Sequence, residues 1–253
     1  VRVADLLHAR CDEILFTNSG TSSDNLAILG FARANAKQGK HLITSAMEHQ
    51  AVLEAMMFLE KKEGFEVTYL QPSRDGLVTS QQVKEALRPD TILVSIMLAN
   101  NEIGTIQPIA QIAQEIHNAR QTTGTFWPVL HTDACQAGSY LNLDVTKLGV
   151  DMLTFNGTKV YGPKGSGCLF VRRGLKLQPL FFGGPQERGL FPGTENVAAI
   201  VGLSRALEFA QTDREVESSR LIPLRDQLIV CILSTIPKTR LNGDRRARLP
   251  NNA

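Results

Sequence analysis

Short runs of apolar and β-branched residues alternate with longer amphipathic stretches along most of the chain. The short runs predict seven strands, at 14–17, 41–44, 65–70, 91–97, 129–132, 152–155 and 168–171. Helical spacing of apolar residues predicts helices at 1–9, 24–36, 51–62, 80–87, 109–120 and 195–210. Nearly continuous apolar strands separated by helices are typical of a parallel sheet covered on both faces. The pattern therefore predicts an α/β fold with a mostly parallel seven-stranded sheet.

The pattern changes near residue 212. Residues 214–236 read as one long helix, or as two helices broken near Pro223, that leaves the sheet behind. We therefore expect a large domain at 1–212 and the start of a smaller C-terminal α+β domain at 213–253. Val1 begins inside a predicted helix and Ala253 follows a turn-like sequence, so we expect a fragment that lacks both termini.

Composition narrows the class of protein. A chain of 253 residues with 43% apolar and 21% charged residues is ordinary for a globular protein. A net charge of +2 is too small to indicate that the protein binds nucleic acid. The basic run at 244–248 is interpreted as a solvated loop. There is no signal peptide and no apolar run of about 20 residues, so we expect no membrane segment. Four cysteines without C-x-x-C spacing indicate a reduced, cytoplasmic protein without a metal site.

Polar side chains follow five of the predicted strands, where each strand ends. In sheets of this kind ligands bind in the loops after the carboxyl ends of the strands. We therefore expect one site to be built from the loops at 18–21, 47–50, 99–102, 133–136 and 156–159.

A lysine lies between the last two predicted strands, in a glycine-rich turn. A lysine at the end of a buried strand is a candidate amine nucleophile for a Schiff base, since burial favours the neutral amine. Lys159 and Lys164 both meet this description, and spacing does not separate them. The alternative is a β-hairpin with two solvated lysines.

Residues 18–25 join the first strand to a helix. Gly20 and the hydroxyl groups of Thr21 and Ser23 would present donors where a helix N-terminus favours an anion, so a phosphate group fits here. The alternative is a capping box formed by Thr21 and Asp24, which would only begin the helix.

Asp133 and His49 are the other candidates for chemistry. A carboxylate at the buried end of a strand needs a cation or a donor, and a protonated pyridine nitrogen would serve. Asp133 could instead cap a helix that begins at Ala134, while Gln136 could donate to a phenolic oxygen. His49 could stack on an aromatic ligand or move protons, or it could be structural.

Together these loops resemble those of the NifS/IscS-type cysteine desulfurases, which belong to the class V aminotransferases of fold type I and use pyridoxal 5′-phosphate. The motif Ser-Gly-Thr-x-Ser-Asp-Asn-Leu-Ala-Ile stands at 19–28, and His-Thr-Asp-Ala-Cys-Gln at 131–136. The lysine motif Lys-x-Tyr-Gly-Pro-Lys-Gly-x-Gly stands at 159–167. The resemblance runs from about Val1 to Asn252 and includes further matching segments at 48–52, 92–105, 183–189, 193–196, 241–244 and 249–252.

The resemblance implies a role for each site residue. Lys159, and not Lys164, would form the Schiff base and act in catalysis together with His49, which would stack on the cofactor ring. Asp133 would pair with the ring nitrogen and Gln136 with the ring oxygen. The remaining cofactor-binding residues would be Asn101 beside the ring and the substrate, and Gly20, Thr21, Asn156 and Thr158 at the phosphate.

The resemblance also implies an activity and partners. The protein would remove sulfur from L-cysteine, giving L-alanine and an enzyme-bound persulfide for a sulfur-acceptor or iron–sulfur scaffold protein. It would form a homodimer in which Thr194 reaches the phosphate of the partner subunit. Two other functions fit the same resemblance: a selenocysteine lyase or related class V aminotransferase, and a truncated, non-catalytic homologue that acts as a binding partner.

The chain departs from the family pattern at several positions. The family usually has Ser-Gly-His before the lysine, where this chain has Asn156-Gly157-Thr158, which predicts weaker retention of the cofactor. Arg-Ser-Gly-Thr is replaced by residues 191–194, Phe-Pro-Gly-Thr. The family's persulfide cysteine and its substrate-binding arginine are expected beyond the end of this sequence, and Cys135 is expected to pack in the interior.

Overall fold

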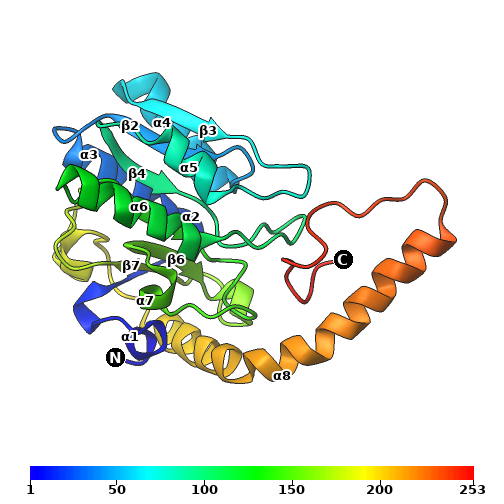
Figure 1. The fold of residues 1–253 in the computed structure, drawn as a ribbon. Helices are drawn as coiled ribbons and strands as arrows, with labels where there is room; N and C mark the ends of the chain where they lie inside the picture. Colours follow the sequence, from blue (N-terminus) through cyan, green and yellow to red (C-terminus); the bar gives the residue numbers. More distant parts are fainter.

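Seven strands form a single sheet in the computed structural model, which describes residues 1–253 (Figure 1). The strand order is β1-β7-β6-β5-β4-β2-β3. Neighbours from β3 through β2, β4 and β5 to β6 run parallel, whereas β7 is antiparallel to both β6 and β1. The predicted mostly parallel sheet is therefore confirmed. The strands are β1 (Ile14–Thr17), β2 (His41–Ser45), β3 (Glu66–Leu70), β4 (Thr91–Ser95), β5 (Val129–Asp133), β6 (Met152–Asn156) and β7 (Gly167–Val171).

Helices cover both faces of this sheet. The α-helices are α1 (Arg2–Leu7), α2 (Gly20–Asn25), α3 (Phe31–Asn35), α4 (Gln50–Glu63), α5 (Ser80–Ala86), α6 (Ile109–Thr123), α7 (Val145–Leu148) and α8 (Val197–Thr235). A π-helical stretch, η2 (Leu26–Gly30), joins α2 to α3. Three short 3₁₀ turns complete the set: η1 (Cys11–Glu13), η3 (Thr158–Val160) and η4 (Gln186–Gly189).

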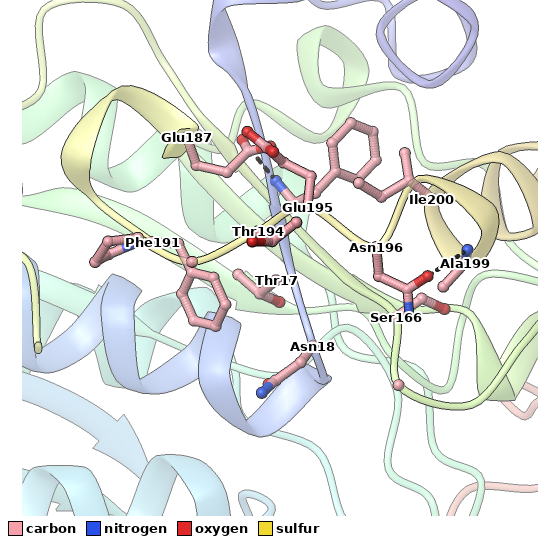
Figure 2. A pocket seen from close by; sticks show the side chains of 14 residues that line it. Thr17, Asn18, Ser166, Glu187, Phe191, Thr194, Glu195, Asn196, Ala199 and Ile200 are labelled. Atoms are coloured by element: carbon pink, nitrogen blue, oxygen red, sulfur yellow. Dashed lines mark hydrogen bonds between the residues drawn. The ribbon is translucent and has the colours of Figure 1, made fainter. Parts of the chain in front are cut away.

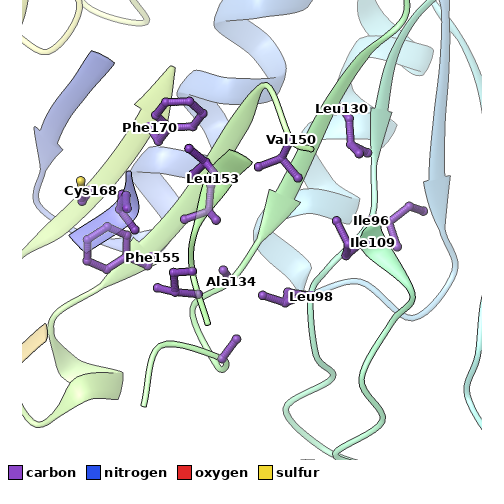
Figure 3. Close-up of a cluster of buried hydrophobic side chains, with 14 of the residues drawn as sticks. Ile96, Leu98, Ile109, Leu130, Ala134, Val150, Leu153, Phe155, Cys168 and Phe170 are labelled. Atoms are coloured by element: carbon purple, nitrogen blue, oxygen red, sulfur yellow. The ribbon is translucent and has the colours of Figure 1, made fainter. Parts of the chain in front are cut away.

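Successive residues of each strand enter two separate cores, because side chains alternate between the faces of a sheet. Leu153 and Phe155 of β6 pack in a core of 27 buried residues that α1, α5, α6, α7 and α8 cover (Figure 3). Met152 of β6 packs in the opposite core of 18 buried residues, beneath the η2–α3 segment and α4. The sheet is thus buried on both faces, which explains why its strands are apolar almost throughout.

Helix α2, which follows β1, begins earlier than the start at residue 24 that the sequence predicts. It starts at Gly20, because the backbone N–H of Ser22 donates to Ser19 Oγ at 3.1 Å and makes Ser19 the N-cap. The alternative of a capping box formed by Thr21 and Asp24 is therefore wrong: Thr21 lies inside the first turn, and Asp24 is buried.

Helix α8 runs unbroken for 39 residues through Pro223, so of the two alternatives for residues 214–236 the single long helix is confirmed. Leu203 and Leu207 pack in the larger core, whereas the second half of the helix extends away from the sheet (Figure 1). The predicted domain change at 212 falls within α8 and stays a prediction. None of the helices, α8 included, has both the length and the apolar character needed to cross a bilayer.

The chain returns after α8 to the loop that follows β4. The backbone N–H of Ile106 donates to Ala247 O, and that of Leu249 donates to Gly104 O, each at 2.8 Å. Arg248 is 4% exposed and donates to Asn252 Oδ1 at 2.5 Å. The prediction of a solvated basic loop at 244–248 is therefore wrong for Arg248, which instead ties this C-terminal segment together.

A buried ion-pair network joins α6 to the central strands and allows a test of the fold. Asp151, 2% exposed, accepts from Arg120 Nη2 at 2.5 Å, from Arg172 Nε at 3.0 Å and from the N–H of Leu130 at 2.9 Å. We expect Arg120→Met to lower the free energy of unfolding by about 2 kcal/mol, since Asp151 would keep only one cation. Urea unfolding measures this.

The control for this variant is Arg173→Met. Arg173 pairs with Asp12 at the surface, where both side chains are about half exposed. Solvent screens such a pair, so its loss is expected to leave the urea midpoint unchanged. Equal losses in the two variants would contradict the role assigned to the buried network.

Candidate functional site

A cavity opens at the carboxyl ends of the parallel strands, as expected for this type of sheet. All five loops that the sequence analysis selected contribute to it. The lining residues are Ser19, Gly20, Thr21, Asp24, His49, Met97, Ala99, Asn101, Asp133, Cys135, Gln136, Asn156 and Lys159. Eight of the ten predicted site residues are among them, whereas Thr158, Thr194 and the competing lysine Lys164 are not.

Lys159 lies in the turn η3 directly after β6. Its backbone N–H donates to Asn156 Oδ1 at 3.0 Å, and its carbonyl accepts from Ser139 Oγ at 3.1 Å. The turn requires glycine at position 157, because a Cβ there would lie 2.2 Å from Ser166 Oγ. The side chain of Lys159 is exposed and not buried as its position at a strand end predicts, so the amine at the cavity is accessible.

Asp133 is the last residue of β5 and is 6% exposed. Its Oδ1 accepts from the backbone N–H of Cys135 at 2.8 Å, and the Cys135 side chain also favours its ionised form. No helix begins at Ala134, so the alternative role of Asp133 as a helix cap is wrong, and the residue stabilises a turn. Burial raises the pKa of Asp133. A cation in the cavity would offset the cost of ionising this carboxyl group.

His49 is the N-cap of α4. Its Nδ1 accepts from the backbone N–H of Ala51 at 3.1 Å, which in the neutral ring leaves the proton on Nε2. The structural role that the sequence offered as an alternative therefore exists, and the ring lines the cavity as well. The capping bond fixes the ring in place.

Two buried acids lie near Asp133, and the sequence analysis assigned neither to the site. Asp24 is 1% exposed and lines the cavity. Glu48 is 5% exposed; its Oε1 accepts from Ser45 Oγ at 2.6 Å and from the N–H of Met97 at 2.9 Å. Burial raises the pKa of Glu48 to about 8 and that of Asp24 well above its usual value. Their positions shortly after predicted strands were the only available signal, and it did not distinguish them from surface acids.

The pKa of Glu48 gives a prediction about stability. A carboxyl group that titrates at 4.5 when unfolded and at about 8 when folded costs stability as the pH rises between these values, because the unfolded state releases its proton first. We compare the free energy of unfolding of Glu48→Gln with that of the unsubstituted protein at two pH values. The difference should be more favourable to the variant at pH 8 than at pH 4, by more than about 1 kcal/mol. Urea unfolding at both pH values checks this. The exposed Glu85→Gln should show no such difference, and an equal effect of Glu48→Gln at both pH values would count against the burial argument.

Thr194 lies in a separate hollow, lined by the β1 end and by residues 187–200 (Figure 2). The backbone N–H of Phe16 donates to Glu187 Oε2 at 3.0 Å, which ties this segment to β1. Thr194 and its neighbour Glu195 are exposed. Thr158, one residue before Lys159, is also exposed and lies outside the cavity lining. The structure thus brings eight predicted residues together and leaves these two threonines outside.

The cavity residues fit pyridoxal 5′-phosphate. Glycine is required at position 20, where a Cβ would lie 2.6 Å from Cys135 Sγ and 3.1 Å from Asn156 Nδ2, so the backbone can approach a phosphate closely. The carboxyl group of Asp133 suits a protonated ring nitrogen, and Lys159 suits an aldehyde. No three His, Cys, Asp or Glu side chains form a cluster that could hold a metal ion.

The model of the family described as aminotransferase class-V matches residues 1–252. Cysteine desulfurase IscS of Methanosarcina thermophila is 50% identical over 251 residues, which make up 99% of this chain and 60% of that protein. A solved NifS-like protein superposes with a TM-score of 0.91 at 35% identity, over 98% of this chain and 66% of its own. The structure of SspA in complex with cysteine gives a TM-score of 0.76 at 45% identity, over 82% of this chain and 58% of its own.

These comparisons confirm the resemblance read from the loops. The chain spans 60% of the length of the curated relative from Methanosarcina thermophila. Its fold is that of the fold type I desulfurases, and proteins of this class depend on pyridoxal 5′-phosphate, which the cavity residues fit. The chain belongs to the class-V aminotransferase family.

Proposed function

We propose that the protein is a pyridoxal 5′-phosphate-dependent cysteine desulfurase, which converts L-cysteine to L-alanine and leaves the sulfur as a persulfide on a cysteine thiolate. The observation that supports this most directly is the common cavity of Lys159, Asp133 and His49, which come from three different loops. An amine, a buried carboxylate and an imidazole around one small cavity are the groups that this chemistry needs.

Each cavity residue has a role in this proposal. Lys159 would hold the aldehyde through Nζ, Asp133 would pair with the ring nitrogen, and His49 would cover the ring face. Gln136 would donate to the phenolic oxygen and Asn101 would lie beside the ring and the substrate. The phosphate would be held by Gly20, Thr21, Asn156 and Thr158, and by Thr194 of the partner subunit.

The cofactor, when bound, supplies an electron sink for an amino acid attached to it. The protein's own residues handle the protons. Lys159 Nζ, exposed at the cavity, is placed to take the Cα proton of the substrate once the amine is free. Asp133 keeps the ring nitrogen protonated. A cysteine thiolate would then bond to the substrate sulfur as the Cβ–S bond breaks, with the bonding electron pair left on the carbon side. Cβ would take up one proton, and Lys159 would return the other proton to Cα to complete L-alanine.

Cys135 is the only cysteine that lines the cavity, and it is poorly suited to act as the thiolate that accepts the substrate sulfur. Burial and the neighbouring carboxyl group of Asp133 raise the pKa of the Cys135 thiol well above its usual value. The thiolate is the nucleophilic form of cysteine, so a thiol with a raised pKa attacks slowly. In this proposal another cysteine of the protein accepts the sulfur, and Cys135 packs against the Gly20 turn.

The proposal extends to partners and location. A homodimer would bring Thr194, which lies outside the cavity of its own subunit, to the cavity of its neighbour. The persulfide would pass to a sulfur-acceptor or iron–sulfur scaffold protein, and the protein would work in the cytoplasm. The absence of paired cysteines supports a reducing compartment.

The experiment that tests the function uses the protein loaded with pyridoxal 5′-phosphate. We expect equal amounts of L-alanine and sulfide from L-cysteine in the presence of a thiol reductant. Activity on selenocysteine alone would favour a selenocysteine lyase, and amino transfer to keto acids would favour an aminotransferase. A parent protein that binds no cofactor would favour the non-catalytic homologue.

The threonine at position 158 gives a further prediction. Thr158 is exposed beside Lys159, and a histidine there would add an imidazole that can carry positive charge near the phosphate. We expect Thr158→His to slow cofactor dissociation severalfold, corresponding to about 1 kcal/mol for one added charge-assisted contact. Dialysis against buffer without cofactor, followed by the cofactor's visible absorbance, measures this. An unchanged rate of loss would mean that position 158 does not contact the phosphate.

A further inference from the structure

Asp24 is a second carboxyl group in the cavity, and no cation offsets its burial; only the Thr154 side chain favours its ionised form. It is 1% exposed, and its Oδ1 has no hydrogen-bond partner. The nearest basic group is His131, whose Nε2 lies 3.7 Å from Asp24 Oδ1. An unpaired buried carboxyl group is costly if ionised, so its protonation state must be explained from its surroundings.

His131 does not supply a cation to Asp24. The ring is fully buried, its Nδ1 lies 2.8 Å from Ser95 Oγ and its Nε2 lies 3.1 Å from Thr154 Oγ1. Burial lowers the pKa of His131 to about 3, so the ring is neutral at physiological pH. Asp24 therefore has no counter-charge behind it.

Asp133 is better prepared to carry a charge than Asp24. The N–H of Cys135 donates to Asp133 at 2.8 Å, and His49 favours its ionised form. Burial raises the pKa of both carboxyl groups, and the charge of Asp133 raises that of Asp24 further. Two carboxyl groups in one buried cavity do not ionise together, and the protons they hold belong to the pair.

We propose that Asp24 and Asp133 share one negative charge on the floor of the cavity, with Asp133 as the carboxylate and Asp24 as a protonated reserve that takes over the charge when Asp133 cannot hold it. Asp24 is thus a positioning residue that acts through Asp133. The inference rests on the proposed function, because the ring nitrogen of pyridoxal 5′-phosphate is the cation that fixes the charge on the pair.

Other titratable groups surround the pair without changing its composition. Three of them line the cavity, on the loops after β2, β5 and β6, and the other two are buried outside its lining. They are His49, Cys135, Lys159, His131 and Glu48. Glu48 differs from Asp24, because it does not line the cavity and its Oε1 already accepts two hydrogen bonds.

A double-mutant cycle on the full-length parent tests the shared charge. The measured quantity is the dissociation constant of pyridoxal 5′-phosphate, followed by fluorescence titration. We expect Asp24→Asn to weaken binding less than about fivefold and Asp133→Asn about tenfold, since Asp24 then ionises and partly replaces the lost carboxylate. The double variant should bind about tenfold more weakly than the product of the single effects.

Glu48→Gln is the matched control, as a buried acid outside the cavity lining. Combined with Asp133→Asn, it should give the product of the two single effects. Infrared difference spectra of the loaded protein provide a second readout. Glu48 is itself largely protonated at neutral pH, so Glu48→Gln identifies its carbonyl band, and Asp24→Asn should remove a second, different band of a protonated carboxyl group. Thermal melting shows whether each variant is folded, and the spectra of the folded Asp24→Asn protein alone test the proton.

Three results would overturn the inference. One is a loss for Asp24→Asn as large as for Asp133→Asn, which would make Asp24 an independent anion. Another is simple multiplication of the two effects in the double variant, and the third is a set of spectra in which Asp24→Asn removes no protonated-carboxyl band. These results would leave the proposed function intact if the parent still binds the cofactor and converts L-cysteine. A parent that binds no cofactor would overturn both proposals.

Discussion

Replacing Lys159 by alanine is expected to lower the rate of L-alanine formation by about 10⁴-fold or more, since one amine serves both as the attachment point and as the base. The fold should be unaffected. The hydrogen bonds that hold the turn η3 use the backbone N–H and carbonyl of Lys159, and the side chain is exposed. Rates of alanine and sulfide production, together with the visible absorbance of the loaded protein, measure the effect.

Lys164→Ala is the control for this variant. Lys164 is exposed, lies in the same glycine-rich segment and does not line the cavity. Its loss should leave the rate within about twofold, as for most surface substitutions away from a site. Sulfide production that persists in Lys159→Ala, or that fails in Lys164→Ala, would show that the wrong lysine has been assigned.

Asp133→Asn is expected to lower turnover of L-cysteine by about 10²- to 10³-fold, the usual effect of removing one preorganised charge that stabilises the transition state. The amide can still accept from the N–H of Cys135, so the turn after β5 keeps its bond. It cannot keep a ring nitrogen protonated, and the electron sink weakens. Turnover must be measured at saturating cofactor, so that weaker binding does not contribute.

Asp12→Asn is a matched control, because Asp12 is an exposed carboxylate that pairs with Arg173 far from the cavity. Its turnover should equal that of the parent. If turnover by Asp133→Asn at full cofactor occupancy stays within a few fold of that of the unsubstituted protein, the assigned pairing of Asp133 with the ring nitrogen is wrong.

The location of the site follows from where the predicted strands end in the sequence. Loops such as 18–21 and 133–136 were predicted to meet, and they do, because parallel strands bring their carboxyl ends to one edge of a sheet. The strand ends themselves are set by local apolar runs, which a sequence shows directly. The antiparallel strand β7 was predicted as a strand, but its insertion between β1 and β6 depends on pairing between distant residues.

Predictions of exact boundaries failed where one local bond competes with another. Ser19 and Thr21 are both good helix caps, and the structure uses Ser19. Pro223 normally disfavours a helix interior, so the sequence left one helix and two helices open, and α8 continues through it. Arg248 reads as part of a basic surface run, but its guanidinium is enclosed by the C-terminal segment. Local propensity alone does not decide such cases.

The sequence by itself determined the α/β pattern, the five loops of the cavity and the family resemblance, because these depend on residues close together along the chain. Only the tertiary structure decided that Asp24 and Asp133 line the same cavity, that Glu48 is buried outside its lining, and that Thr194 lies in a separate hollow. Burial and the approach of charges are sums over side chains from distant strands. The local sequence around an acidic residue is therefore the same whether its carboxyl group contacts water or is buried beside a neutral histidine.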